Sequence, residues 1–339
     1  MMEKVLVTGG SGYVAQFVMA QALAAGYAVR TTVRNVAKSQ AKVRAGLTEL
    51  GADASGVEFV AADLTHDDGW LEAMNGIDFV LHVASPMPLD LPKDENDLII
   101  PAKEGALRVM QAAHAAGVKR VVMTSAFGAV GMGRADNEHV FTEEDWAVLD
   151  GPGMNAYYKS KTLAERAVWD FADQSGLEVV TMLPVAVLGP LLGGEANGSN
   201  HLIQMLLTGA MPGLLDIAIP IVDVRDVARA HVLALQGDVA GERFILSNGN
   251  GMKLAEIARI LRANLSAEET AKLPKSSVPS WLLRLLAPVV PLLKQTVPDL
   301  GVVKKMSNAK AQRLLNWQPQ YSNEETLLQV AKMILVAKN

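Results

Sequence analysis

The sequence predicts an α/β fold, in which a doubly wound parallel sheet is followed by a smaller, mostly helical C-terminal lobe. Short apolar runs alternate with helical stretches up to residue 183, as expected for repeated β–α–β units. The strand runs are almost continuously apolar, which is typical of strands covered by helices on both faces. Beyond that point proline, glycine and asparagine cluster and helical patches follow. We therefore expect one domain over residues 1–183 and mainly a second lobe over 184–339, with some segments returning to the first.

Each predicted strand is a short apolar run that ends at a turn residue or a helix former. The first strand, for example, stops at Gly9 and Gly10, and Gly117 ends a strong helical stretch. The predicted strands are 4–8, 28–33, 57–61, 78–83, 120–124, 178–183 and, in the second half, 243–247. The predicted helices are one that ends at residue 25, then 36–50, 67–74, 102–116, 156–173, 201–208, 224–235, 253–264, 280–293 and 323–336.

Composition excludes several classes of protein. Of the 339 residues, 50% are hydrophobic and 20% are charged, which fits a globular chain with a sizeable core. The net charge of −5 gives no bulk attraction to nucleic acid. The absence of cysteine excludes disulfides, a cysteine nucleophile and cysteine-ligated metals. The six histidines are scattered without metal-ligand spacing, so we expect no metal site.

The chain shows no secretory signal and no membrane span in its sequence. The apolar run near the N-terminus stops at the two glycines. The most apolar later stretch, 281–293, contains Arg284, Pro288 and Pro291 and is too short to cross a bilayer. We expect a buried or amphipathic helix there, and a cytoplasmic protein.

A glycine-rich turn follows the first strand. Gly9 and Gly12 lie three residues apart, and Ala15 takes the next place in the same spacing. A turn of this kind brings the backbone close to a pyrophosphate and directs the free N–H groups of a helix N-terminus toward its charge. No G-K-[ST] sequence follows, which excludes a P-loop. The turn therefore predicts a dinucleotide site in a Rossmann-type domain.

The end of the second strand indicates which dinucleotide binds. The acidic residue that would hold a ribose 2′-hydroxyl is missing, because no Asp or Glu occurs between Tyr27 and Thr48. Arg34 ends the strand and Lys38 lies one turn into the next helix. Two cations there can pair with a 2′-phosphate, so we expect NADP (NADPH) rather than NAD. Asp63 and Leu64 follow the third strand, where they could contact the adenine. For Asp63, the alternative is that its side chain caps a helix.

A second motif opens the long helix after the fifth strand. Tyr157 and Lys161 are four residues apart and therefore share one helical face. A free phenol has a pKa near 10, and a neighbouring ammonium group lowers it by stabilising the phenolate. Tyr157 can then give its proton to a carbonyl oxygen while hydride reaches the carbon. Tyr158 has only Thr162 four residues on, which makes Tyr157 the better candidate.

At this point the sequence resembles the extended short-chain dehydrogenase/reductases of the NAD-dependent epimerase/dehydratase superfamily. Within them it is similar to the branch of dihydroflavonol, cinnamoyl-CoA and aldehyde or ketone reductases. The resemblance is carried by VTGGSGYVA at 7–15, FVLHVASP at 79–86, PAKEGALRVMQAA at 101–113, KRVVMTSA at 119–126, YYKSKTLAERAVW at 157–169, LPVAVLGP at 183–190 and VDVRDVARAHVLAL at 222–235. It implies a dinucleotide-binding Rossmann domain over 1–183, which includes the catalytic helix, and a substrate-binding lobe over 184–339.

The resemblance also implies roles for individual positions. Gly9 and Gly12 would hold the pyrophosphate, Arg34 and Lys38 the 2′-phosphate, and Asp63 and Leu64 the adenine. Val83, Ala84 and Ser85 would line the ribose and nicotinamide path, Lys161 would bind the nicotinamide ribose, and Pro184 and Val187 would flank the nicotinamide amide. Tyr13, Val14, Thr124 and Tyr157 complete the set expected at the cofactor.

One departure from the family bears on catalysis. The family usually has Thr-Ser-Ser after the fifth strand, with the last serine as the catalytic hydroxyl. This chain reads Thr124-Ser125-Ala126, so alanine stands at the expected position. Ser125 or Thr124 would have to replace it, and Ser125 joins Tyr157 and Lys161 as the third candidate catalytic residue. Otherwise the carbonyl loses a donor that contributes about 3 kcal/mol of transition-state stabilisation.

The residues expected at the substrate are mostly apolar: Pro86, Met87, Phe127, Val185 and Met205. They fit an apolar or aromatic aldehyde or ketone better than a sugar nucleotide, whose diphosphate needs cations. Lys304 and Lys305 are expected to be a solvated surface patch. The leading hypothesis is therefore NADPH-dependent carbonyl reduction to an alcohol, with a small-molecule carbonyl as the substrate and no nucleic acid as a partner.

Two other functions and the oligomeric state stay open. The alternatives are an NAD-dependent nucleotide-sugar epimerase or dehydratase, and an NADP-sensing regulator without turnover. Apolar residues on the 156–173 helix, including Leu163, Val168 and Phe171, either form a dimer interface or pack internally. We expect a monomer or a homodimer.

Overall fold

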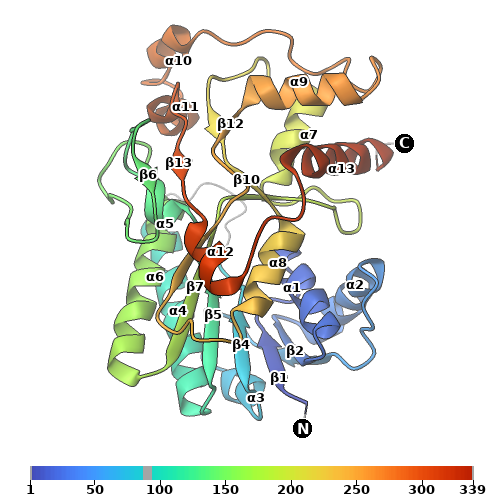
Figure 1. The fold of residues 1–339 in the computed structure, drawn as a ribbon, viewed down its shortest axis with the longest axis vertical. Coiled ribbons are helices and arrows are strands. Elements are labelled where there is room, and N and C mark those ends of the chain that lie inside the picture. Colours follow the sequence, from blue (N-terminus) through green and yellow to red (C-terminus); the bar gives the residue numbers. More distant parts are fainter. Residues whose placement is uncertain (1, 87–93, 338–339) are drawn as a thin grey trace.

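A seven-stranded parallel sheet forms the centre of the protein in the computed structural model, which describes residues 2–86 and 94–337 (Figure 1). The strand order is β11-β7-β5-β4-β1-β2-β3, and every neighbouring pair is parallel. The doubly wound fold predicted from the sequence is therefore confirmed. The strands are β1 (Lys4–Val7), β2 (Ala28–Val33), β3 (Glu58–Ala61), β4 (Phe79–His82), β5 (Arg120–Thr124), β7 (Glu178–Pro184) and β11 (Arg243–Leu246).

Helices cover both faces of this sheet. Successive residues of β1 point to opposite faces, so Val5 and Val7 join one apolar cluster while Leu6 joins the other. The first cluster packs under α1 (Tyr13–Ala24), α2 (Val36–Glu49) and α8 (Val224–Leu233). The second packs under α3 (Trp70–Met74), α4 (Asn96–Ala115) and α6 (Ala156–Ser175). Burial on both faces explains why the strand sequences are continuously apolar.

The sheet has a topological switch point between β1 and β4. From β1 the chain moves outward through β2 and β3, and it then crosses back to place β4 on the other side of β1. The loops that follow β1 and β4 consequently diverge and leave a crevice at the carboxyl ends of the strands. Ligands of open α/β sheets bind in this crevice.

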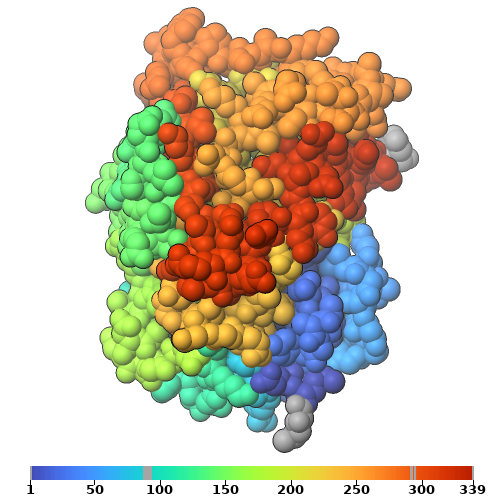
Figure 2. Space-filling view, in the orientation of Figure 1, coloured from blue at the N-terminus to red at the C-terminus, as the bar shows by residue number. Residues whose placement is uncertain are grey.

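The C-terminal lobe lies over the same edge of the sheet (Figure 1). Its helices α7 (Asn200–Thr208), α9 (Leu254–Asn264) and α13 (Asn323–Val336) share an apolar cluster of their own. Figure 2 shows the C-terminal part of the chain, orange to red, at the top of the molecule and running down across its front. The lobe also contains the short strand pairs β8 (Ala186–Leu188) with β10 (Ile221–Asp223) and β9 (Ala218–Ile219) with β12 (Met252–Lys253).

Several returning segments tie the two parts of the chain together. β11 joins the central sheet beside β7, and α8 packs against α1. β13 (Lys305–Met306) pairs with β6 (Val140–Phe141), which follows the short helix α5 (Gly128–Gly131). The helix α12 (Ala309–Leu315) then packs near β11. The lobe is thereby attached to the sheet at several points of the sequence.

The predicted helix over 280–293 is wrong in one respect, because two short helices stand in its place. They are α10 (Ser280–Leu286) and α11 (Pro291–Thr296), which a short 3₁₀ turn, η1 (Val297–Asp299), follows. Pro288 and Pro291 lack the N–H that a continuous helix requires. The helix α4 also begins six residues earlier than predicted, with Pro101 inside it, because Leu98 and Ile99 are buried in that added turn.

Among the described residues, no helix combines the length and the hydropathy that crossing a lipid bilayer requires.

Candidate active site

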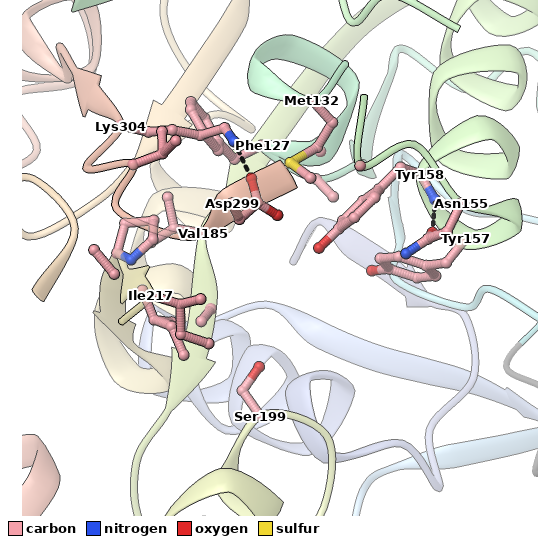
Figure 3. Close-up of a pocket in the computed structure, with 18 of the residues that line it drawn as sticks. Phe127, Met132, Asn155, Tyr157, Tyr158, Val185, Ser199, Ile217, Asp299 and Lys304 are labelled. Atoms are coloured by element: carbon pink, nitrogen blue, oxygen red, sulfur yellow. Dashed lines mark hydrogen bonds and ion pairs between the residues drawn. The ribbon is translucent and has the colours of Figure 1, made fainter. Parts of the chain in front are cut away.

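A cavity of about 430 Å³ lies at the carboxyl end of the sheet, between the sheet and the C-terminal lobe (Figure 3). Its size is within the range of small-molecule sites. The walls come from the loop after β5, the start of α6, the β7–β8 segment, the start of α7, β9, and the end of α11 with the segment that follows it. The lining residues are Ala126, Phe127, Gly128, Met132, Gly153, Asn155, Tyr157, Tyr158, Pro184, Val185, Ala186, Ser199, Ile217, Ala218, Ile219, Pro220, Gln295, Thr296, Asp299, Val302 and Lys304.

The N-terminus of α6 places Tyr157 at this cavity. Asn155 caps the helix, since its side-chain oxygen accepts a hydrogen bond from the Tyr158 N–H at 3.0 Å. Tyr157 then occupies the first turn, and its phenol points into the cavity (Figure 3). Lys161 lies one turn later, where its ammonium donates to the Thr124 carbonyl at 3.3 Å. The cap thus fixes the start of the helix, and the helix sets the spacing of the two side chains.

Burial controls the protonation of both groups. Burial, with a smaller contribution from Tyr158, raises the pKa of Tyr157 to about 12, which is opposite to the lowering expected from Lys161. Burial also lowers the pKa of Lys161 to about 8, although the negative charge of Glu165 opposes this shift. At neutral pH the phenol therefore carries its proton and the lysine is mostly charged. This is the protonation state that a proton donor with a cationic neighbour requires.

The glycine turn after β1 fits a dinucleotide. Gly9 has φ +72°, and a Cβ there would stand 2.9 Å from the Cβ of Ala84, in the loop after β4. Gly12 caps α1 without any side-chain hydrogen bond, and the first turn of that helix, which begins at Tyr13 and Val14, has no acidic residue. The first N–H groups of the helix lack intrahelical partners and carry the positive end of its dipole. The turn is therefore shaped and charged to receive a pyrophosphate.

Hydrogen bonds from neighbouring strands hold this turn in place. The Gly9 N–H donates to the Thr32 hydroxyl at 3.1 Å. The Thr8 hydroxyl accepts the Ala84 N–H at 3.0 Å and shares a hydrogen bond of 2.9 Å with His82. Burial lowers the pKa of His82 to about 3, so this histidine is neutral and structural. These contacts align the loops after β1 and β4 on the two sides of the crevice.

The basic residues predicted for the 2′-phosphate are exposed at the end of β2. Arg34 and Lys38 both lie on the surface, and the Asn35 side chain caps α2 between them. Hydrogen bonds from Thr65 lower the pKa of Asp63, and the positive charge of Arg34 makes a smaller contribution in the same direction. The Asp63 carboxylate accepts the Thr65 N–H at 2.9 Å, so it closes a tight turn rather than capping a helix. Leu64 is half-buried beside it.

Ser125 points away from the cavity. Its side chain is 2% exposed, and its hydroxyl donates to the buried carboxylate of Glu165 at 2.6 Å. Thr124 is also engaged, since its hydroxyl shares a hydrogen bond of 2.7 Å with His231. Of Thr124, Ser125 and Ala126, the residue that lines the cavity is Ala126, which has no hydroxyl. The geometry thus argues against Ser125 as a replacement for the family serine.

A buried ion pair beneath the site was not anticipated from the sequence. Glu165 is fully buried and accepts from Arg243 Nε at 2.8 Å and from the Thr181 hydroxyl at 2.8 Å. Arg243 stacks on Trp146, 3.8 Å from the ring centroid, and donates to the carbonyl of Glu143. The partners are far apart in the sequence, so no local pattern signals the pair. Only the position of Glu165 one helical turn after Lys161 hints at it.

The predicted substrate residues divide into two groups. Phe127 and Val185 line the cavity, as does Pro184 from the cofactor set. Met205 does not line it, because it lies on the outer side of α7 with 41% of its surface exposed. Pro86 is half-buried outside the lining, and Met87 lies outside the described residues. Val83, Ala84, Ser85 and Val187 are half-buried near the strand ends.

The prediction for Lys304 is wrong. Its side chain is only 11% exposed, lines the cavity and forms an ion pair of 2.8 Å with Asp299. Lys305, the next residue, is partly exposed and pairs with Glu138 at 3.3 Å. The pairing of β13 with β6 turns these two neighbours in opposite directions, which a sequence of two lysines does not reveal.

The apolar pattern of the Tyr157 helix is explained within one chain. Val168 is fully buried against α4 and the sheet, and Phe171 packs partly buried on the same cluster. Leu163 is half-buried. These contacts require no second copy of the chain.

Comparison with known proteins gives a family match and two reductases as relatives. Residues 5–246 match the NAD dependent epimerase/dehydratase family. The chain is 35% identical over 272 residues to an anthocyanidin reductase ((2S)-flavan-3-ol-forming) of Vitis vinifera, covering 75% of this chain and 79% of the relative. It is 36% identical over 262 residues to cinnamoyl-CoA reductase 1 of Arabidopsis thaliana, covering 76% and 74%.

A solved structure extends the comparison to nearly the whole chain. Gre2 from Candida albicans, solved in complex with NADPH, superposes with a TM-score of 0.79 at 25% identity. The superposition covers 99% of this chain and 100% of Gre2. The C-terminal lobe, where the sequence carries few recognisable motifs, is therefore part of the same architecture.

Proposed function

Because the chain belongs to the NAD-dependent epimerase/dehydratase family, in the reductase branch of its extended short-chain members, we propose that it reduces an apolar or aromatic aldehyde or ketone to the alcohol. It is an NAD(P)-dependent oxidoreductase, and NADP(H) is its cofactor. The observation that carries the proposal is the Tyr157 phenol, which faces a largely apolar cavity with Lys161 one turn behind it.

The residues present fit the cofactor. Gly9 and the N-terminus of α1 would receive the pyrophosphate, and Arg34 with Lys38 would pair with the 2′-phosphate. Lys161 would hold the nicotinamide ribose. Bound NADPH supplies the hydride for the carbonyl carbon.

Tyr157 supplies the proton in this proposal. The carbonyl oxygen gains negative charge as its carbon is reduced, and an alkoxide is more basic than a phenolate. The phenol is protonated at neutral pH because its pKa lies near 12, so the proton is available. The Lys161 ammonium stabilises the phenolate that remains, and solvent then restores the proton.

The cavity walls favour this function over nucleotide-sugar chemistry. An unpaired cation would favour the diphosphate of a nucleotide sugar, whereas Lys304, the cation of the described lining, is already paired with Asp299. Phe127, Met132 and Val185 instead offer apolar contact to an alkyl or aryl group.

The test is oxidation of NADPH in the presence of aromatic and aliphatic aldehydes and ketones, with NADH run in parallel. We expect turnover with NADPH and a fall of about 10²–10⁴-fold in kcat for Tyr157→Phe, because the proton donor is removed. Tyr27→Phe is the matched control, since the Tyr27 hydroxyl only accepts a surface hydrogen bond from Gln236.

Two outcomes would contradict the proposal. Purified protein that carries tightly bound NAD⁺ and converts UDP- or dTDP-sugars, but no simple carbonyl, would assign it to the epimerases. NADPH binding without turnover of any carbonyl would favour a sensor.

A further inference from the structure

An ion pair stands in the cavity wall across from the proposed proton donor. Asp299 ends the 3₁₀ turn after α11, and Lys304 precedes β13. Their side chains pair at 2.8 Å with 31% and 11% of their surface exposed. Figure 3 shows Lys304 across the cavity from Tyr157, with Asp299 lying between Lys304 and Tyr158. The two ends of the cavity therefore differ in chemistry.

The Asp299–Lys304 ion pair is electrically neutral, but the Asp299 carboxylate can still accept further hydrogen bonds. Lys304 neutralises Asp299, so neither a carboxylate nor an ammonium group on a substrate finds an uncompensated opposite charge there. A carboxylate has about four acceptor positions, of which Lys304 engages only some. A neutral hydroxyl can donate to one of the others without disturbing the pair, and hydrogen bonds to charged groups are the stronger ones.

Tyr158 adds a neutral polar group between this ion pair and Tyr157, because its ring centroid lies 5.6 Å from that of Tyr157. Its ring packs close to Gly128, and its hydroxyl reaches the cavity beside Asp299 (Figure 3). Burial, with the charge of Asp299 as a further cause, raises the pKa of Tyr158, so the phenol stays protonated. It can accept a hydrogen bond from a substrate hydroxyl or donate one to it.

We propose that Asp299 and Lys304 form a specificity site that selects carbonyl substrates with a neutral hydroxyl at the end remote from the carbonyl, and that rejects substrates with a carboxylate there. The inference rests on the proposed function for the direction in which a substrate lies. It goes beyond that function because it names the group that the far end of the substrate carries.

The test measures binding rather than turnover. Cinnamaldehyde, 4-hydroxycinnamaldehyde and 4-carboxycinnamaldehyde are titrated by calorimetry into protein with NADP⁺, which cannot deliver hydride. A solution of about pH 6 keeps the phenol of 4-hydroxycinnamaldehyde neutral and the carboxylate of 4-carboxycinnamaldehyde charged. We expect the hydroxylated aldehyde to bind about tenfold more tightly than the parent, as one hydrogen bond to a charged group provides. The carboxylated aldehyde should bind more weakly than the parent.

Two variants should respond in opposite directions. Asp299→Asn frees the Lys304 charge, so it should remove the preference for the hydroxyl and strengthen binding of the carboxylated aldehyde. Lys304→Met leaves Asp299 unpaired, so it should retain the hydroxyl preference and weaken carboxylate binding further. A general loss of folding would weaken all three ligands together. Asp238→Asn, at an exposed position outside the cavity, is the matched control.

The affinities of the three aldehydes decide whether the specificity site exists. Equal affinity of the wild-type protein for the parent and the hydroxylated aldehyde overturns it, and so does an Asp299→Asn variant that keeps the preference. Absence of binding by all three aldehydes counts as equal affinity. NADPH oxidation with 4-hydroxycinnamaldehyde is measured separately, because failure to turn over a ligand that binds selectively contradicts the proposed function and not the specificity site.

Discussion

At the scale of single residues, the site depends on which hydroxyl groups reach the cavity. Tyr157 does so because a capped helix begins one residue before it. Ser125 does not, because Glu165 binds its hydroxyl on the other side of the loop. Ala126 occupies the cavity wall without a donor. The carbonyl oxygen is therefore expected to depend on Tyr157 more heavily than in relatives with a serine there.

Replacing the missing hydroxyl tests this expectation. Ala126→Ser should raise kcat about tenfold, since a second donor to the developing alkoxide stabilises the transition state. Ser125→Ala should instead lower the free energy of unfolding by about 1–3 kcal/mol, because Glu165 loses a buried hydrogen bond. Steady-state kinetics and urea unfolding separate the two effects. A hundredfold loss of kcat in Ser125→Ala with unchanged stability would restore Ser125 as the catalytic donor.

In the proposed reaction, the charge of Lys161 is expected to set an alkaline limit on activity. Its pKa of about 8 means that the ammonium is lost as the pH rises through 8, so kcat/KM for reduction should fall above that pH. Stability should change in the opposite sense. The unfolded lysine titrates near 10.5, so between about 8 and 10.5 the unfolded state binds more protons and stability gains from this group as pH rises. The pH dependence of kcat/KM checks the first prediction, and thermal unfolding across the same pH range checks the second. A kcat/KM that stays constant to pH 10 would contradict the pKa of about 8 for Lys161.

At the scale of elements, the glycine turn between β1 and α1 carries the cofactor prediction. Two constraints meet at Gly9, namely a positive φ and the approach of Ala84 from the loop after β4. The first is a property of the turn itself. The second arises only because the sheet order places β4 beside β1. The turn is thus held in shape by its neighbour as well as by its own sequence.

Two glycine variants separate these constraints. Gly9→Ala combines φ +72° with a Cβ contact of 2.9 Å to Ala84, so the turn must shift and NADPH affinity should fall at least about tenfold. Gly26→Ala is the matched control, because Gly26 has φ +87° but no atom within 4 Å of the new Cβ. It should lose stability and keep its NADPH affinity. Fluorescence titration of NADPH measures both, and equal affinities would show that the contact with Ala84 is unimportant.

At the scale of the whole molecule, buried polar contacts connect segments that are distant in the chain. Arg243 on β11 joins Glu165 on α6 to the loop that contains Glu143 and Trp146. β13 pairs with β6 and carries Lys304 to the cavity wall. The helix that carries Tyr157 and the lobe over the cavity are therefore both attached through contacts with residues 140–146 or with β11.

Breaking the buried ion pair between Glu165 and Arg243 should destabilise the fold. Glu165→Gln leaves the Arg243 charge uncompensated, and we expect the free energy of unfolding to fall by about 3–5 kcal/mol. Glu195→Gln removes an exposed partner of Lys42 and should cost about 0–1 kcal/mol. Urea unfolding of the two variants gives the comparison. Similar losses in both would show that the buried pair contributes no more than a surface pair.

By itself the sequence determined the features that depend on local pattern. Apolar periodicity located the seven strands of the central sheet and most of the helices, but not the short strand pairs outside that sheet. The glycine spacing located the turn after β1, and the four-residue spacing placed Tyr157 and Lys161 on one face. Each of these needs only a few consecutive residues. Tertiary structure decided which way side chains point and which charges pair. Ser125 turned to Glu165, Lys304 turned inward to Asp299, and Met205 turned outward, because packing between distant segments determines burial and no local spacing encodes it.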